Sequence, residues 1–254
     1  MTDELVHIAR EGPVLTLTLD SAHNRNALSS LLLDQLAEGL AQAAADRGVR
    51  VVVLTATGTV FCSGADLSER AGAVTSRMPE ILTAIRAAPV PVVARVGGHA
   101  RAGGLGLITA CDLAVATREC TFAFSEVRIG VAPAMILVPA LRVASRRFLG
   151  RASLTGEPFS ATVAAQAGVL TDVVEDAAGL DVWLDGVVAS ILKSAPGAVA
   201  ATKALLGQLP ELPWSDGLEV ARATSVELFG GAEAAEGMDA FLGKRAPSWD
   251  STAP

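Results

Sequence analysis

The sequence has few cysteines, no long apolar run and no cluster of metal ligands. Its three cysteines, Cys62, Cys111 and Cys120, have the spacing of neither a zinc site nor a disulfide framework. No window holds the roughly 18 consecutive apolar residues of a membrane span, and residues 1–12 carry acids without an apolar stretch. These absences predict a cytoplasmic protein with no metal and no membrane partner.

Charge is also scarce. Only 19% of the 254 residues are charged, the formal net charge is -7, and the 20 basic residues are scattered along the chain. A nucleic-acid-binding protein would gather its basic residues on one surface, so this class is not expected. The 51% hydrophobic content is enough for a large core in one globular domain, with or without an appendage.

Two patterns divide the chain near residue 180. Before it, apolar β-type runs alternate with helical spacing, and the runs cover residues 14–19, 49–55, 91–96 and 112–116. Ser29 or Ser30 precedes the first helical pattern as a candidate N-cap. After it, amphipathic helices are predicted over residues 181–192, 198–208, 213–228 and 232–242. The sequence predicts an α/β core over 1–180, with ligands at strand ends, and a helical oligomerisation region over 181–254.

The first motif that could carry chemistry is Phe-Cys-Ser-Gly-Ala-Asp-Leu at residues 61–67, just after a predicted strand. Gly64 permits a sharp turn, and the small Ala65 leaves a backbone amide open to a ligand. The alternative is an ordinary turn in which Asp66 caps a helix.

The second motif is the glycine-rich segment 97–112, between a predicted strand and an apolar helix. Glycines there bring backbone amides and the positive end of the helix close to a ligand oxygen, which is an anion-binding design. Its spacing matches neither the dinucleotide fingerprint nor the phosphate loop. The alternative is tight helix–strand packing. His99 has no second ligand or nucleophile nearby in the sequence and is expected to be structural.

The third motif centres on Glu126, an isolated carboxylate in the otherwise apolar segment 121–133. Desolvation would raise its pKa and suit it to proton transfer. The alternative is a structural ion pair with Arg128.

Taken in this order, the three motifs resemble the core of the crotonase (enoyl-CoA hydratase/isomerase) family. Asn-Ala-Leu at 26–28, Leu-Thr-Gly at 154–156 with the segment 164–170, and Phe-Leu-Gly-Lys-Arg at 241–245 extend the resemblance over nearly the whole chain. The segment around Glu126 looks closest to single-glutamate hydratases of the methylglutaconyl-CoA type. The resemblance implies a crotonase-like ββα spiral whose C-terminal helices form trimers or dimers of trimers.

The resemblance also implies roles for individual residues. The backbone amides of Ala65 and Gly103 would hold the thioester oxygen as an oxyanion hole, and Glu126 would be the acid/base. Coenzyme A, as part of the substrate and not as a separate cofactor, would meet a further set of residues, some of them from a neighbouring subunit: Arg25, Ala65, Asp66, Leu67, Phe241 and Lys244.

One departure from the family pattern leaves the reaction open. Hydratases of the best-known type carry a second glutamate at the position that is Gly106 here. The first hypothesis is an enoyl-CoA hydratase of fatty acid metabolism. The alternatives are a Δ3,Δ2-enoyl-CoA isomerase using Glu126 alone and a non-catalytic acyl-CoA-binding protein. The acyl chain is not determined, and Arg101 or Arg128 could meet a carboxylate on it.

Overall fold

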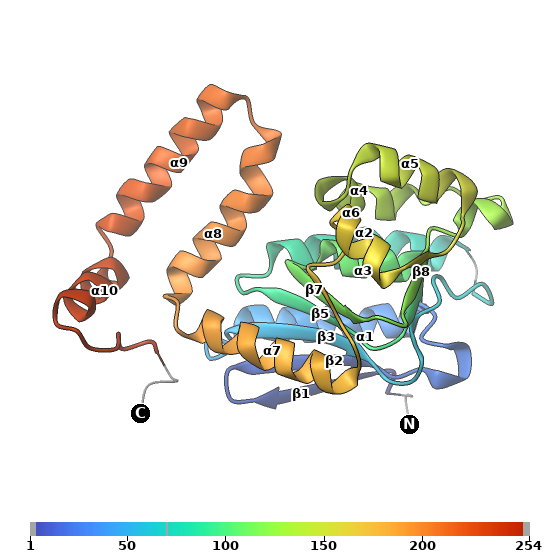
Figure 1. Cartoon of the computed structure of the whole chain (residues 1–254), viewed down its shortest axis with the longest axis horizontal. Coiled ribbons are helices and arrows are strands. Elements are labelled where there is room, and N and C mark those ends of the chain that lie inside the picture. The colour runs from blue at the N-terminus through green and yellow to red at the C-terminus, as the bar shows by residue number, and fades with distance from the viewer. Residues whose placement is uncertain (1–3, 70, 251–254) are drawn as a thin grey trace.

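The computed structural model describes residues 4–69 and 71–250, except for the side chains of 71–76. Two β-sheets form the centre of the molecule, helices cover them, and a group of C-terminal helices stands to one side (Figure 1). This is the α/β arrangement that the alternation of strand and helix patterns predicted.

The larger sheet has the strand order β1–β2–β3–β5–β7–β10 and is parallel apart from the β1–β2 hairpin. Every second residue of β2 is buried, whereas β3 is buried on both faces, as a covered parallel strand should be. The predicted runs all form strands. The strand bounds are β1 (Val6–Glu11), β2 (Val14–Leu19), β3 (Val51–Ala56), β5 (Val92–Val96), β7 (Leu113–Thr117) and β10 (Asp172–Val174).

The smaller sheet consists of very short strands in the order β4–β6–β8–β9, in which β4, β6 and β8 are parallel and β9 is antiparallel. Their bounds are β4 (Val60–Cys62), β6 (His99–Arg101), β8 (Thr121–Ala123) and β9 (Phe159–Ser160). Strands of two or three residues are too short to show a period, so the sequence patterns did not reveal this sheet.

Helices pack around these sheets. The Ser29 hydroxyl accepts a hydrogen bond from the Leu32 amide at 3.2 Å, so Ser29 and not Ser30 is the N-cap of the first long helix. The bounds are η1 (Ala22–Asn24), α1 (Ser30–Ala45), α2 (Ala71–Ala87), α3 (Gly103–Ala110), η2 (Glu126–Ile129), α4 (Ala134–Val143), α5 (Arg146–Thr155) and α6 (Ala161–Ala167).

The next helix, α7 (Ala177–Leu192), lies against the larger sheet. Trp183 and Val188 pack against the buried cluster of Val51, Val53 and Val93, and the Trp183 indole donates to Asp172 at 2.9 Å. The predicted boundary at residue 180 therefore falls inside a helix that packs on the core. The division into two domains stays a prediction.

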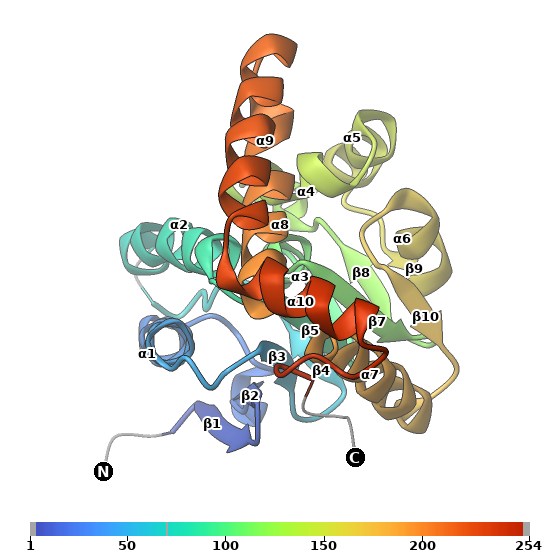
Figure 2. The same ribbon diagram turned by 90° about the vertical axis from the view of Figure 1, so that its left-hand side faces the viewer.

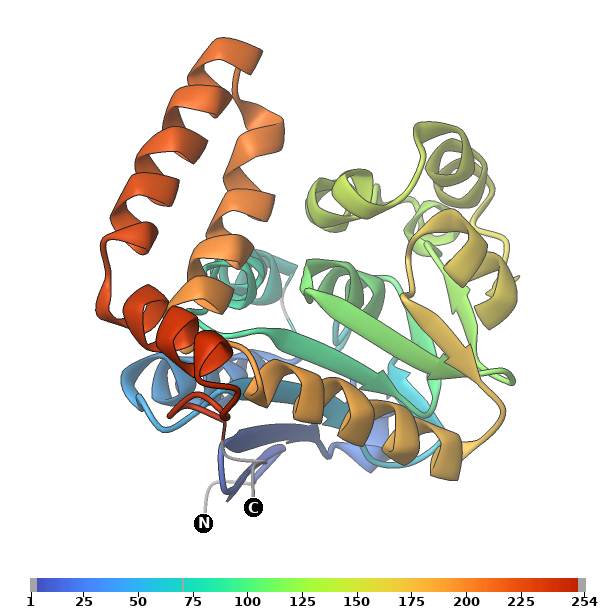
Figure 3. The same cartoon turned by 60° about the vertical axis from the view of Figure 1, so that its left-hand side comes forward.

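The last helices form an arm beside the sheets, with α8 and α9 rising side by side (Figures 1, 2 and 3). Their bounds are α8 (Pro196–Gln208), η3 (Leu209–Glu211), α9 (Trp214–Phe229) and α10 (Ala232–Leu242), close to the predicted helices. In the described part of the chain no single helix is long and apolar enough to cross a membrane. The helix pair α7 and α8–η3 together has the length and composition of a membrane span, but its two members are bent by 109° relative to each other.

A buried lysine ties the arm to the core. The Lys203 ammonium on α8 donates to the carbonyls of Ile85 and Val90 at 2.9 and 3.0 Å and lies 2.7 Å from the Asp112 carboxylate. Burying a charge is tolerated when it is paired and hydrogen-bonded in this way.

We expect Lys203→Met to lower the free energy of unfolding by about 2 kcal/mol, because three charge-assisted interactions are lost and two carbonyls are left without their donor. Urea unfolding measures this. Lys193→Met is the matched control, since Lys193 is an exposed lysine just before the arm. Equal stability of the two variants would show that Lys203 does not anchor α8.

Candidate active site

Three turns meet at one edge of the smaller sheet. Because β4, β6 and β8 are parallel neighbours, the segments that leave their carboxyl ends emerge on the same side. Gly64 and Ala65 follow β4, Gly103 follows β6, and Glu126 follows β8. The fold thus brings together the three motifs singled out in the sequence.

The first turn presents the Ala65 amide. The Leu28 amide donates to the Gly64 carbonyl at 2.8 Å, and the Asp66 amide donates to the Leu28 carbonyl at 3.1 Å. In such a parallel bridge the intervening residue points its own N–H away from the partner strand. No acceptor takes the Ala65 amide proton within residues 4–69 and 71–250.

The second turn presents the Gly103 amide. Gly103 is the first residue of α3, where backbone N–H groups have no intrahelical acceptor, and none outside the helix takes its proton in the described structure. The preceding Ala102 has φ +47°, a backbone conformation that alanine rarely adopts. Its amide is held by the Ala123 carbonyl at 3.0 Å, so β8 fixes the turn.

The two turns touch each other. A Cβ atom on Gly64 would lie 2.8 Å from the Ala102 Cβ and 3.8 Å from the Gly103 nitrogen, and one on Gly103 would lie 2.7 Å from Leu28 Cδ1. Gly64 also has φ +101°. Glycine is therefore required at position 64, whereas a Cβ on Gly103 would have to displace the end of the buried Leu28 side chain. Two unbonded amides stand close together, and the one of Gly103 is at a helix N-terminus, where an oxyanion is favoured.

Glu126 begins η2 with a partly buried side chain, and its Oε2 is buried without a hydrogen-bond partner. Burial raises the pKa of its carboxyl, against a smaller opposing effect of its own backbone amide. Arg128 does not pair with it, because its guanidinium Nε donates to the Thr155 carbonyl at 3.3 Å. The structural ion pair weighed from the sequence is absent among the described residues.

Two other candidates are engaged with the protein itself. Arg101 donates to the carbonyls of Ala100 and Thr121 and to the Thr121 hydroxyl, and burial lowers its pKa. His99 Nδ1 accepts from the Thr121 amide at 3.2 Å. His99 thus has the structural role expected of it, and Arg101 holds β6 to β8.

The helix position matching the second glutamate is tightly packed. A Cβ on Gly106 would lie 2.5 Å from Ile136 Cγ2 and 3.0 Å from Met78 Cε. Both neighbours are buried. The contact could not be foreseen, because it joins α3 to α2 and α4, which are distant in the sequence. No carboxylate could stand at position 106 without displacing these side chains.

The residues expected to meet coenzyme A fall in two places. Near the first turn, Arg25 is exposed and its carbonyl accepts from the Ser63 amide at 3.1 Å. Asp66 does not cap a helix: it accepts from the Ser68 amide and hydroxyl and from Asn24, and these hydrogen bonds lower its pKa. The neighbouring Leu67 is 75% exposed.

The other two lie on the arm. Phe241 is exposed at the end of α10, and Lys244 follows it with φ +51°. Figure 1 places α10 on the opposite side of the molecule from β8. Their predicted contact with coenzyme A would therefore have to involve a neighbouring subunit, and it stays a prediction.

A family model described as enoyl-CoA hydratase/isomerase matches residues 9–252. The chain belongs to this family. Its sequence is 36% identical to that of an enoyl-CoA hydratase from Mycobacterium smegmatis. The crystal structure of that protein superposes with a TM-score of 0.93, over 98% of this chain and 100% of the other. It is 32% identical to the 2,3-dehydroadipyl-CoA hydratase of Escherichia coli K12, over 95% of this chain and 97% of the relative.

A third similar protein is a putative enoyl-CoA hydratase from Mycobacterium avium paratuberculosis K-10, 45% identical, with a TM-score of 0.77 over 98% of this chain and 100% of the other. Membership confirms the crotonase fold and implies an acyl-CoA thioester as the substrate class. The part of the chain that the structure describes contains no group of three or more His, Cys, Asp or Glu placed to hold a metal ion.

The contact between the two turns generates a prediction. Gly64→Ala should reduce turnover of an enoyl-CoA by about 10²-fold, because the added Cβ pushes Ala102 and misplaces both amides. Gly58→Ala is the control: Gly58 also has a positive φ, +76°, but its Cβ would meet nothing within 4 Å. Steady-state kinetics should show near-normal turnover for Gly58→Ala. Similar activity of the two variants would contradict the role of the turns.

Proposed function

We propose that this protein is a single-base enoyl-CoA isomerase: Glu126 moves a proton between carbons 2 and 4 of a 3-enoyl-CoA while two backbone amides hold the enolate. The observation that carries the proposal is one partly buried carboxylate, with an unpartnered oxygen, at the same sheet edge as two unbonded amides. Such an arrangement suits a reaction that needs one base and one oxyanion site.

The reaction balances with these groups alone. The Glu126 carboxylate takes a proton from carbon 2, and the electron pair of the C–H bond delocalises onto the thioester oxygen. The amides of Ala65 and Gly103 stabilise that oxyanion. The protonated Glu126 then returns the proton to carbon 4, and the double bond moves from carbons 3 and 4 to carbons 2 and 3.

The packing around Gly106 supports isomerisation over hydration. Hydration needs a water molecule held in place for attack at carbon 3. Here the position of a second carboxylate is filled by the apolar side chains of Ile136 and Met78, which cannot hydrogen-bond to water. Glu126 would have to position and deprotonate that water without help.

Hydration is the second candidate. It was the first hypothesis from the sequence, and the likeness to proteins named as hydratases supports it, at 36% identity for the Mycobacterium smegmatis protein and 32% for the Escherichia coli one. A single carboxylate can in principle take a proton from water and return one to carbon. Hydration would then be slower than isomerisation in this site.

The arm has the kind of surface that a neighbouring subunit would cover. Large apolar side chains on the arm are exposed, including Trp214 at 83%, Phe229 at 74% and Phe241 at 84%. Monomeric proteins rarely expose so many on one set of helices. We therefore expect a homo-oligomer in which a neighbouring subunit covers part of the arm and brings Phe241 and Lys244 to the coenzyme A.

Product analysis tests the reaction. Purified protein is incubated separately with trans-3-hexenoyl-CoA and crotonyl-CoA, and the products are separated by chromatography. We expect conjugated 2-enoyl-CoA from the first substrate and at most slow formation of 3-hydroxyacyl-CoA from the second. Faster hydration than isomerisation would overturn the proposal in favour of the second candidate.

The same assay with Glu126→Gln separates an enzyme from a binding protein. This variant should bind acyl-CoA as the wild type does and lose about 10²-fold or more of its turnover. Glu119→Gln is the matched control, because Glu119 is an exposed acid just before β8. Absence of turnover in the wild type, with acyl-CoA affinity unchanged in Glu126→Gln, would mean a non-catalytic acyl-CoA-binding protein.

The raised pKa of Glu126 gives a pH dependence. The base must be ionised to take a proton, so kcat/KM should fall as pH drops through a value above the ordinary glutamate pKa of 4.5. Burial disfavours the ionised form of Glu126 in the folded protein. The folded state therefore loses stability as pH rises from the ordinary glutamate pKa through the raised pKa of Glu126. Glu126→Gln should therefore raise Tm more at pH 8 than at pH 4.5. An acid limb at or below pH 4.5 would contradict the desolvated carboxylate.

A further inference from the structure

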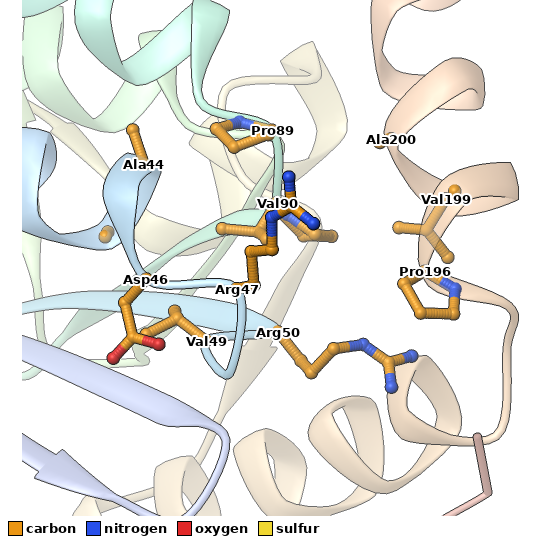
Figure 4. Close-up of a pocket in the computed structure, with 13 residues that line it drawn as sticks. Ala44, Asp46, Arg47, Val49, Arg50, Pro89, Val90, Pro196, Val199 and Ala200 are labelled. Atoms are coloured by element: carbon orange, nitrogen blue, oxygen red, sulfur yellow. The ribbon is translucent and has the colours of Figure 1, made fainter.

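A cleft lies between the core and the arm, away from the turns of the candidate active site. Its volume is about 410 Å³, which is within the range of small-molecule sites. Its walls come from the end of α1 and the loop to Arg50, from Pro89–Pro91 before β5, and from the first turn of α8 (Figure 4). The first two segments directly precede β3 and β5, so the cleft is at the amino ends of these strands. It shares no residue with the candidate active site.

The walls are largely apolar. Proline and valine side chains from both the core and the arm face the opening, as Figure 4 shows. They are Val49, Pro89, Val90, Pro91, Pro196 and Val199. An apolar body of a ligand would lose water on entering between them.

The charged residues that line the cleft are Asp46, Arg47 and Arg50, and the Glu233 carboxylate of the arm acts on Arg50 from nearby. The Asp46 carboxylate is 2.8 Å from the Arg10 guanidinium and also accepts from the Gly48 amide at 2.8 Å. Arg50 uses one nitrogen, Nη2, to donate to the Ser194 carbonyl at 2.6 Å. Burial lowers the pKa of Arg50, and the charge of the Glu233 carboxylate partly opposes that shift.

Arg47 is the charged residue of the cleft that makes no polar contact with the rest of the described protein. In the described part of the chain it has neither a hydrogen bond nor an ion pair, and Figure 4 shows its guanidinium directed into the cleft beside Val90. The amides at the N-terminus of α8 are not available to an anion, because the Glu233 carboxylate accepts from Gly197 and Ala198. Arg47 is therefore the group in the cleft that is open to an anion, whereas Arg50 is directed toward the carbonyl of Ser194.

The cleft is held open by anchors on both sides. Lys203 fixes α8 to the carbonyl of Val90, and Arg50 fixes the end of α7 through the Ser194 carbonyl. A ligand would not have to order these walls on binding, which lowers the entropic cost of association.

We propose that this cleft binds a small amphipathic organic anion, with its carboxylate or phosphate on Arg47 and its apolar body between the proline and valine walls. A guanidinium forms strong paired hydrogen bonds with either kind of anion. Because the walls belong to both the core and α8, the bound ligand stabilises the arm in its position on the core.

Thermal shift and titration calorimetry with octanoate test the proposal, with octyl phosphate, inorganic phosphate and neutral octanamide as comparison probes. We expect octanoate or octyl phosphate to raise Tm, and the preferred one identifies the anionic group. Inorganic phosphate and octanamide should bind at least tenfold more weakly, because the first lacks the apolar body and the second lacks the negative charge. No binding of either amphipathic anion at 10 mM would overturn the proposal.

Two variants locate the site. Arg47→Gln, at an exposed loop position, should weaken binding of the preferred probe by about tenfold or more. Val199→Phe should do so by filling the cleft. Arg146→Gln is the control, since Arg146 is an exposed arginine on α5 outside the cleft. Arg47→Gln should leave acyl-CoA turnover unchanged. Probe affinity that is unaffected by Arg47→Gln, or that is lost on saturation with acyl-CoA, would place the probe elsewhere and contradict the inference.

Discussion

The parallel pairing of three short strands, β4, β6 and β8, is the constraint on which the site depends. It delivers two turns and one carboxylate to one edge of the sheet, although these are separated by about sixty residues of sequence. The turns can meet because Gly64 has no side chain, since a Cβ there would lie 2.8 Å from the Ala102 Cβ. The Ala65 amide is unbonded because of the bridge to Leu28, and the Gly103 amide because it is at the start of α3. Ala102 keeps its strained conformation because β8 holds its amide.

At Glu126, the candidate acid/base, burial and not a charged partner sets the direction of the pKa shift. Among the described residues no arginine pairs with Glu126, so no ion pair lowers its pKa, and its buried Oε2 has no hydrogen-bond partner. The apolar packing at Gly106 acts in the same direction by keeping a second carboxylate out. Stability and function are opposed here, because an ionised buried carboxylate without a partner destabilises the fold.

Much of this could be predicted from the sequence, and the limits have physical causes. Alternation in β2, the apolar run of β3 and the cap at Ser29 are local signals, and all of them are confirmed. The motifs around Gly64 and Gly103 could be recognised because turns that expose amides favour glycine. The motif around Glu126 could be recognised because a single carboxylate stands in an apolar segment. Strand β1 was not predicted, since half of its short sequence is polar and exposed. The filling of the Gly106 position, the Lys203 anchor and the arginine cleft are tertiary contacts, which no local pattern records.

A crystal structure with a non-reactive acyl-CoA analogue is the most direct test of the account. The account predicts that the thioester oxygen lies about 2.7–3.1 Å from the amide nitrogens of both Ala65 and Gly103, with a Glu126 oxygen facing carbon 2 and no other carboxylate in reach. A thioester oxygen bound by other groups, or a Glu126 side chain turned away from the reacting carbons, would contradict it.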